Sequence, residues 1–313
     1  MLLALYGQGK TRGKVAILGF EASTNQACAS IILNNKINRE YIFHFLSSQY
    51  EKIRNASNSG GQENLSGQII KNIQVPLPPE TEQKEIASVL SNVDALLTQL
   101  DALIAKKRDL KQAAMQQLLT GQTRLPGFDG EWEVAELGEL ERKGLLRLFR
   151  GNVISKKDIE NSPGEYPIYS SSVKQGGLFG CYGKFMFEEE LITWSVDGGG
   201  DFFYRHPHRF SVTNVCGFIR VFSAQINCRF LAFQLDFLHG NMRFDYTSKA
   251  HPSIIRKAYK LILPSRDEQN AISTILTEMD AEITTLEARR DKTRFLKLGM
   301  MQELLTGKTR LVR

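Results

Sequence analysis

Residues 69–125 read IIKNIQVPLPPETEQKEIASVLSNVDALLTQLDALIAKKRDLKQAAMQQLLTGQTRL. Residues 255–311 repeat this pattern as IRKAYKLILPSRDEQNAISTILTEMDAEITTLEARRDKTRFLKLGMMQELLTGKTRL. Gln83 of the first copy corresponds to Gln269 of the second, and this spacing of 186 residues holds throughout without a gap. Both copies run from Leu-Pro into a long apolar-periodic segment and close on Leu-Leu-Thr-Gly-x-Thr-Arg-Leu. The period exceeds the roughly 20–50 residues of solenoid repeats, so the chain contains a duplicated domain.

Weaker similarity precedes each copy. Thr24–Cys28 resembles Thr213–Cys216, and Asn38–Ile42 resembles Asn227–Leu231. Each repeating unit therefore consists of a variable module followed by a similar helical module.

The helical modules carry the seam of a coiled coil. Apolar residues alternate four and three positions apart, as the a and d positions of a heptad do; they are Ile86, Leu90, Val93, Leu97, Leu100 and Ile104, and then Ile272, Leu276, Met279, Ile283 and Leu286. The seam turns polar in mid-helix at Lys107, Lys111, Arg290, Thr293 and Lys297. Ser265 has capping-box spacing to Glu268, and Gly121 and Gly307 suit left-handed C-terminal caps, so each helix should hold about 40 residues.

A helix of that length with an exposed apolar stripe needs a partner. A coiled coil that merely dimerises the chain is one interpretation. Two matched helices in one chain, with a whole domain between them, instead favour an antiparallel pair that acts as a spacer of fixed length.

The composition is that of an ordinary globular protein. The chain has 313 residues, 42% hydrophobic and 24% charged, which favours two domains. A net charge of +6 and a pI of about 9.0 are compatible with a phosphate-bearing partner. The four cysteines form no C-x-x-C pair, no apolar run is long enough for a membrane span, and the start lacks signal-peptide features. We therefore expect reduced thiols and a cytoplasmic location.

The second variable module, residues 131–264, reads as an α+β domain. Short β-like runs at 166–169, 185–187, 191–196, 202–204 and 217–222 are separated by Gly, Asn and Ser turns, and a helical pattern covers 227–238. These runs predict a small, mainly antiparallel sheet.

Basic, polar and aromatic side chains interleave in this module, in a pattern typical of nucleic-acid binding. Cations can bind phosphates, while Ser, Gln, Asn and Arg can reach base edges. A solvated basic surface is the competing interpretation. The candidate DNA-binding residues are Arg147, Arg150, Asn152, Lys156, Tyr169, Ser170, Ser171, Ser172, Lys174, Gln175, Trp194, Arg205, His206, His208, Arg209 and Lys249, with Lys10, Arg12 and Lys14 in the first module.

Three short patterns resemble nucleotide-binding or metal-binding sites, but their sequence context does not support such sites. Residues 4–11 match a relaxed phosphate-loop pattern, but a strand-like run follows in place of the helix that such a loop requires. The segment 197–201 reads as a turn, and His206-x-His208 has no further clustered ligands. We expect no cofactor, no metal and no catalysis by this chain.

At this point the order of modules resembles that of the specificity subunits of type I restriction-modification systems. The motifs that carry the resemblance span nearly the whole chain. They are Tyr6–Ile17, Thr24–Cys28, Leu77-Pro-Pro with Glu82-Gln83, Leu118–Leu125, Pro126–Phe128 and Trp132-Glu-Val in the first part, and Glu165–Ser171, Ile192–Trp194 and Thr213–Gly217 in the second.

The resemblance implies a DNA-reading, non-catalytic subunit. Two target-recognition domains (1–78, partial, and 123–264) would each read half of a split DNA site, and two spacer helices (79–122 and 265–313) would pack as an antiparallel coiled coil. The helices would also dock DNA-adenine methyltransferase subunits, and restriction/translocase subunits could join them.

One departure from the pattern concerns the first module. It has only 78 residues before the spacer helix, against about 135 in the second, so roughly 60 are expected to be missing from its start. A second hypothesis follows, in which a truncated subunit acts as a dimerising half-site reader or an assembly scaffold, by self-association or with a complementing fragment.

Overall fold

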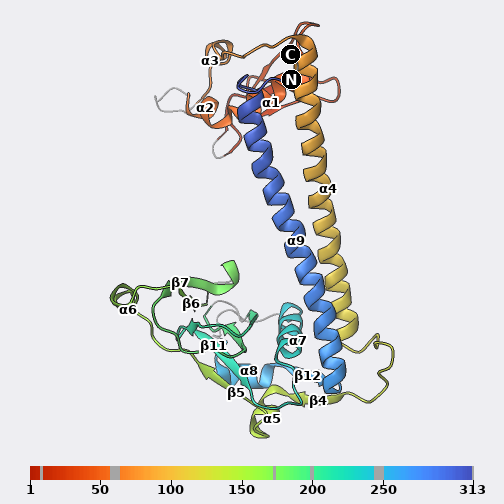
Figure 1. The fold of residues 1–313 in the computed structure, drawn as a ribbon, viewed down its shortest axis with the longest axis vertical. Coiled ribbons are helices and arrows are strands. Elements are labelled where there is room, and N and C mark those ends of the chain that lie inside the picture. The colour runs from red at the N-terminus through yellow and green to blue at the C-terminus, as the bar shows by residue number, and fades with distance from the viewer. Residues whose placement is uncertain (8–9, 57–63, 172–173, 198–200, 243–249, 312–313) are drawn as a thin grey trace. The chain divides into compact units, whose positions relative to one another are not determined.

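The computed structural model describes residues 1–7, 10–56, 64–171, 174–197, 201–242 and 250–311. Its contacts divide the chain into two units: residues 1–106 with 283–313 form the first, and residues 107–282 form the second. Two long helices, α4 (Glu80–Leu119) and α9 (Arg266–Leu304), each contribute one part to each unit (Figure 1). The two spacer helices are thus parts of both compact units, and neither forms a domain of its own.

The long helices have the predicted length and seam, with 40 residues in α4 and 39 in α9. Cross-helix ion pairs are Lys297–Asp94 and Arg290–Asp101 in the first unit and Lys111–Asp280 and Lys107–Glu282 in the second. In each unit the residue number rises on one helix as it falls on the other, so the helices are antiparallel there. The polar interruption of the seam is therefore filled by lysine and arginine side chains that reach carboxylates of the facing helix.

The glutamine that the repeat places near the start of each long helix, Gln83 or Gln269, joins that helix to the module before it. In the first unit Asn38 N–H donates to Gln83 Oε1 (2.9 Å), and Gln83 Nε2 donates to the Pro78 carbonyl (2.9 Å). In the second unit Asn227 N–H donates to Gln269 Oε1 (2.8 Å), and Gln269 Nε2 donates to the Pro264 carbonyl (2.9 Å). One amide side chain thus satisfies a backbone donor and a backbone acceptor at both junctions.

The first unit is built on a three-stranded antiparallel sheet of order β2-β1-β3. Its strands are β1 (Leu2–Ala4), β2 (Val15–Ala16) and β3 (Cys28–Ser30), and its short helices are α1 (Arg39–Ser48), α2 (Tyr50–Asn55) and α3 (Gly67–Lys71). Leu3, Tyr41 and Phe45 are buried with Leu90 of α4 and Leu305 in one apolar core. The ends of both long helices therefore belong to the core of this unit.

The described residues of the second unit form three sheets, with strand orders β5-β11-β8-β9, β10-β6-β7 and β12-β4. All pairings are antiparallel except β10 with β6. The strands are β4 (Glu133–Glu136), β5 (Leu146–Arg150), β6 (Tyr166–Tyr169), β7 (Leu178–Tyr182), β8 (Leu191–Ser195), β9 (Phe202–Arg205), β10 (Ser211–Val212), β11 (Cys216–Val221) and β12 (Lys260–Leu263). The helices are α5 (Leu137–Arg142), α6 (Lys156–Asn161), a 3-10 turn (Lys174–Gly177), α7 (Cys228–Gly240) and α8 (Pro252–Ala258).

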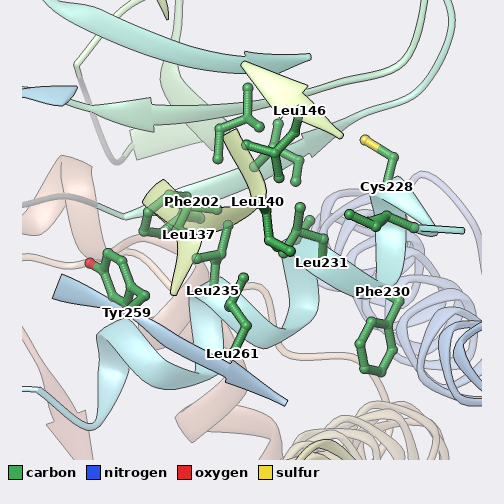
Figure 2. Close-up of a cluster of buried hydrophobic side chains, with 14 of the residues drawn as sticks. Leu137, Leu140, Leu146, Phe202, Cys228, Phe230, Leu231, Leu235, Tyr259 and Leu261 are labelled. Atoms are coloured by element: carbon green, nitrogen blue, oxygen red, sulfur yellow. The ribbon is translucent and has the colours of Figure 1, made fainter. Parts of the chain in front are cut away.

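The main core of the second unit lies between the four-stranded sheet and α7. Figure 2 shows Leu137, Leu140 and Leu146 in one buried cluster with Leu231 and Leu235 of α7. Each fully buried leucine of this kind stabilises the fold by roughly 2 kcal/mol. The segment from β4 to β5 is therefore an integral part of this core.

A second, aromatic cluster covers the other face of the four-stranded sheet. Phe149 stacks on Phe218 at 5.1 Å between ring centroids, and Phe187 contacts Phe218 at 4.7 Å. Tyr169, at the end of β6, packs against this cluster. The aromatic contacts hold the small sheet of β6, β7 and β10 against the larger one.

Most predicted elements of the second module are confirmed, and two expectations are wrong. The runs at 166–169, 191–196, 202–204 and 217–222 form β6, β8, β9 and β11, and the helical pattern forms α7. The run at 185–187 is not a strand; Phe187 makes a single bridge to Phe210. The capping box at Ser265 is only half present, because the Glu268 carboxylate binds Arg124 and Trp132 in place of the cap backbone.

Gly121 and Gly307 both adopt the left-handed backbone conformation predicted for C-terminal caps, with φ of 70° and 75°. Within the described residues, none of the helices combines the length and apolar character that a membrane span requires.

Candidate nucleic-acid interface

A polar and aromatic cluster lies where β6 ends. The guanidinium carbon of Arg205, the last residue of β9, lies 3.6 Å from the centroid of the Tyr169 ring. The Tyr169 hydroxyl lies 3.1 Å from Nε2 of His208. We refer to Tyr169, Arg205 and His208 as the Tyr169 cluster. It joins the ends of two strands that belong to different sheets.

Arg205 is the support of this cluster. Its side chain is 7% exposed, its Nε donates to Thr193 Oγ1 (2.9 Å) and its Nη2 donates to the Gly176 carbonyl (2.7 Å). Burial lowers the pKa of Arg205, but a guanidinium remains charged at any physiological pH. The buried Arg205 guanidinium therefore links the segment around Gly176 to β8 and β9.

The loop after β6 is tied down by further hydrogen bonds. Ser170 N–H donates to the Gly177 carbonyl (2.8 Å), and Thr213 Oγ1 donates to Ser170 Oγ (2.9 Å). Ser195 Oγ donates to the Ser171 carbonyl (2.8 Å). These contacts give Ser170 and Ser171, both half-buried, fixed positions at the rim of the sheet.

Two histidines extend the cluster toward solvent. The rings of His206 and His208 stack with centroids 4.4 Å apart, and His208 Nδ1 lies 2.6 Å from the His206 carbonyl. Desolvation, followed by the charges of His208 and the nearby arginines, lowers the pKa of His206, so it is neutral at pH 7. A neutral imidazole both donates and accepts, which suits contact with a base edge better than with a phosphate. Within the described part of the chain, no three His, Cys, Asp or Glu side chains gather as metal ligands.

Exposed cations of β5, α6 and the loop after β9 lie in the same unit. Arg147 and Lys156 are exposed, and so is Asn152 just beyond β5. Arg150 Nε donates to the Asn214 carbonyl (3.0 Å), and Arg209 pairs with Glu188. An exposed ion pair of this kind is weak and can exchange its carboxylate for a phosphate.

Three predicted contact residues are buried. Trp194 is fully buried, and its Nε1 donates to the Ala250 carbonyl (2.8 Å), so its indole cannot reach DNA in this conformation. Arg205 is buried as described, and Arg12 of the first unit is only 6% exposed. The expectation of direct contact by these three is corrected, because an aromatic or cationic residue type alone does not reveal burial.

The other predicted residues fall into two groups. Lys10 and Lys14 are exposed but belong to the first unit, whereas the Tyr169 cluster belongs to the second. Ser172 and Lys249 lie outside the described residues, as do the side chains of Lys174 and Gln175 in the 3-10 turn.

Sequence reasoning missed the residues that hold this loop in place. Thr193 and Thr213 anchor Arg205 and Ser170, yet neither is basic or aromatic. The signal for Thr213 was available in the repeat of Thr-Asn at 24–25 and 213–214. A threonine that is repeated in both modules indicates a structural role common to them, rather than a DNA contact that differs between them.

Comparison with known proteins adds the following findings. Residues 4–107 and 129–293 match the family described as "Type I restriction modification DNA specificity domain". A polypeptide of Mycoplasma pneumoniae named as the N-terminus of a type I specificity subunit is 41% identical over 95 residues, which are 30% of this chain and 50% of that polypeptide. Another protein so named from the same organism is 28% identical over 212 residues, which are 66% of this chain and 81% of that protein.

Among solved structures, the S subunit of a type I restriction-modification system from M. genitalium has the same fold. The TM-score is 0.69 at 18% identity, and the match covers 97% of this chain and 82% of that one.

Proposed function

This chain belongs to the type I restriction-modification DNA specificity family, and we propose that its second unit reads part of a DNA target to which the chain directs partner subunits. The chain is a specificity subunit and so is not itself a catalyst. Chemistry on DNA is left to separate polypeptides.

The Tyr169 cluster is the observation that carries the proposed DNA reading. Arg205 of the cluster donates to the Gly176 carbonyl of the loop after β6. Thr213 and Ser195 hold the small polar residues Ser170 and Ser171 of the same loop at the rim of the sheet, and exposed cations lie in the same unit. Loops held on a rigid scaffold are the usual carriers of recognition. Half or more of the hydrogen bonds to DNA go to the sugar-phosphate backbone, while base edges in the major groove carry the sequence information.

We assign the exposed and the buried residues different roles. Arg147, Lys156 and Arg209 would bind phosphates, as would Lys10 and Lys14 of the first unit. Asn152, Ser171 and His206 would reach base edges, and Ser172, Lys174, Gln175 and Lys249 remain candidates for either role. Trp194 and Arg205 support these residues from the interior.

Partner subunits need a surface of their own. On α9 in the first unit, Phe295, Leu296 and Leu298 are 74%, 57% and 62% exposed. An exposed apolar patch on a long helix is a typical protein interface. We assign this patch to a DNA-adenine methyltransferase subunit and expect restriction subunits to join that assembly in the cytoplasm. Phe295→Ser should then reduce co-purification of that methyltransferase. Phe20, which is also 74% exposed, provides the matched control, and Phe20→Ser should leave co-purification unchanged.

Selection from a randomised duplex pool tests the main proposal. The chain, in complex with its methyltransferase subunit, should enrich a defined sequence. His206→Ala or Ser171→Ala should relax the preference at individual positions, at a cost of about 1–3 kcal/mol per lost base contact. Enrichment of no sequence at all would refute DNA reading.

The half-site reader remains the second candidate, because within the described residues the first unit has fewer strands than the second. Sedimentation of the purified chain separates the two. A homodimer that selects a symmetric site would favour the half-site reader, and a monomer that selects an asymmetric site would favour the bipartite subunit.

A further inference from the structure

Among the residues that the structure describes, the strand that covers β12 in the second unit has no counterpart in the first. β12 pairs with β4, with Leu261 opposite Ala135 and Leu263 opposite Glu133. The internal repeat makes Val75 and Leu77 the counterparts of Leu261 and Leu263. Leu263 is 7% exposed, whereas Leu77 is 55% exposed. Among the described residues, the N–H groups of Val75 and Leu77 have no backbone partner.

The proline at position 76 is compatible with strand pairing on that edge. In the second unit Leu137 N–H donates to the Tyr259 carbonyl, so Tyr259 directs its backbone groups at the strand that contains β4. Because this direction alternates along an antiparallel strand, Leu261 and Leu263 also direct their N–H and carbonyl groups at β4, and Ile262 directs its N–H and carbonyl away from it. The Ile262 carbonyl accepts instead from Gln234 of α7 (2.7 Å). Its counterpart Pro76 likewise presents its carbonyl to the Tyr41 hydroxyl of α1 (2.8 Å). Pro76 therefore lacks its N–H on the side that faces α1, and the N–H groups of Val75 and Leu77 remain available on the open edge.

A second open edge lies on β3. In the second unit β11 is covered on one side by β5, with Phe218 opposite Phe149. Ser30 of β3 is the counterpart of Phe218. Ile31 exchanges hydrogen bonds with Met1 (3.0 and 2.8 Å), so Ser30, opposite Leu2, directs its N–H and carbonyl away from β1. The neighbouring Ile32 is 92% exposed.

An apolar groove of about 500 Å³ adjoins both open edges. It is lined by residues of the β3 edge, α1, α3 and the Val75 edge, among them Ser30, Ile42, Ile70, Ile73, Val75 and Leu77. In the second unit the corresponding elements are covered by residues 133–150. There β4 pairs with β12, α5 packs on α8, and β5 pairs with β11. Leu137, Leu140 and Leu146 of that segment enter the core shown in Figure 2.

A site for a tryptophan adjoins the same edge. In the second unit Trp132 lies against Gly121, where an added Cβ would be 3.3 Å from the indole, and its Nε1 donates to Glu268 (3.0 Å), which also binds Arg124. The first unit repeats this site without the indole. Glu82 binds Arg310, and among the described residues no atom lies within 4 Å of a Cβ built on Gly307.

We propose that the first unit binds a strand–helix–strand segment from outside residues 1–313, patterned like Trp132–Arg150, along these two edges. Its first strand would pair with Val75 and Leu77, its last with Ser30, and its apolar residues would fill the groove. Its tryptophan would lie on Gly307 and donate to Glu82. The template segment is acidic around its first strand and helix, and Lys71 lines the groove, so the charges are complementary. This binding does not depend on DNA reading by the second unit.

A synthetic peptide of residues 131–153 of this chain, added to the full-length chain, tests the proposal by hydrogen–deuterium exchange. The amides of Ser30, Val75 and Leu77 exchange freely in the absence of a partner and should slow at least tenfold when the peptide saturates the chain. Fluorescence anisotropy of the labelled peptide should show saturable binding. A peptide with Leu140→Asp and Leu146→Asp should bind at least tenfold more weakly, because both side chains enter the core.

Variants of the chain locate the binding. Leu77→Asp should weaken peptide binding at least tenfold, while Val153→Asp, at a position 74% exposed in the second unit, should leave it unchanged. Unprotected amides at saturating peptide, or equal binding by the Leu77→Asp chain, would overturn the proposal. A chain that dimerises alone with these amides already protected would also overturn it, because a second copy would then be the occupant.

Discussion

Arg205→Met should loosen the second unit and abolish DNA sequence selection, whereas Arg209→Met should leave the fold intact. Arg205 is the last residue of β9, and Arg209 follows it four residues later. Arg205 is buried against Tyr169 and donates to Thr193 and Gly176. Arg209 is exposed beside Glu188. Sequence alone treats them as equivalent cations, and the structure makes one a support and the other a surface group.

The magnitude for Arg205 follows from its contacts. Two hydrogen bonds from a charged donor contribute about 1.5–3 kcal/mol each, and stacking on Tyr169 adds about 1 kcal/mol. The uncharged variant no longer requires burial of a cation, which offsets part of this loss. A net loss of about 3 kcal/mol is expected for the second unit. With a urea m-value of about 2 kcal/mol/M, the unfolding midpoint should fall by about 1.5 M.

Tryptophan fluorescence measures this loss in one unit. The chain has two tryptophans, Trp132 and Trp194, and both belong to the second unit. DNA binding measured at several salt concentrations gives the second readout. Arg209→Met should lower the salt slope by about one phosphate and change the urea midpoint by less than 0.5 M. Arg205→Met should lose the preference for the selected sequence with its salt slope unchanged.

Equal urea midpoints for the Arg205→Met chain and the unmodified chain would refute the supporting role of Arg205. A reduced salt slope in the Arg205→Met variant would refute it as well, because that result requires the guanidinium to reach a phosphate.

Three further predictions concern the same unit and the seam. Desolvation raises the pKa of Asp236 to about 6, so the folded state holds a proton that the unfolded chain releases near pH 4; because the side chain is partly open to solvent, which screens the effect, stability should fall by no more than about 1 kcal/mol as pH rises from about 4 to 6, and urea titrations of Asp236→Asn should lack that slope. A Cβ on Gly217 would lie 2.1 Å from the Trp194 ring, so Gly217→Ala should lower the urea midpoint by an amount equivalent to about 1–3 kcal/mol; an unchanged midpoint would show that the indole can shift. Lys111→Met and Lys297→Met should each change hydrogen-exchange stability at the seam by less than about 1 kcal/mol, because each removes a partly exposed ion pair from a seam that accepts apolar residues; a loss above 3 kcal/mol in either variant would contradict this.

Local patterns predicted the helices well because their causes are local. The heptad spacing from Ile86 to Ile104 requires a buried seam, whereas the carboxylates that pair with the lysines interrupting it became visible only in the structure. Gly121 and Gly307 predicted left-handed caps because other residues are strained at such positions. The repeat of Gln83 at Gln269 likewise indicated a shared junction, whose hydrogen bonds are the same in both units.

The candidate site was less predictable because burial is not local. Trp194 and Arg205 have residue types common in DNA contacts, yet both are buried in the second unit. Conversely, Thr193 and Thr213 are neither basic nor aromatic, and only the Thr-Asn repeat marks Thr213, although both hold the arginine and the loop in place. Their partners lie 12 and 43 residues away along the chain, beyond the reach of periodicity.

The sequence by itself determined the duplication, the two long helices and the family, because these depend on residue order and on spacing along one helix. Tertiary structure alone decided which cations are supports, and it showed that Val75, Leu77 and Ser30 form open edges. The physical reason is that an edge strand and a paired strand can have the same sequence pattern. Whether a neighbour satisfies their backbone hydrogen bonds depends on residues far away in the chain, or on another chain.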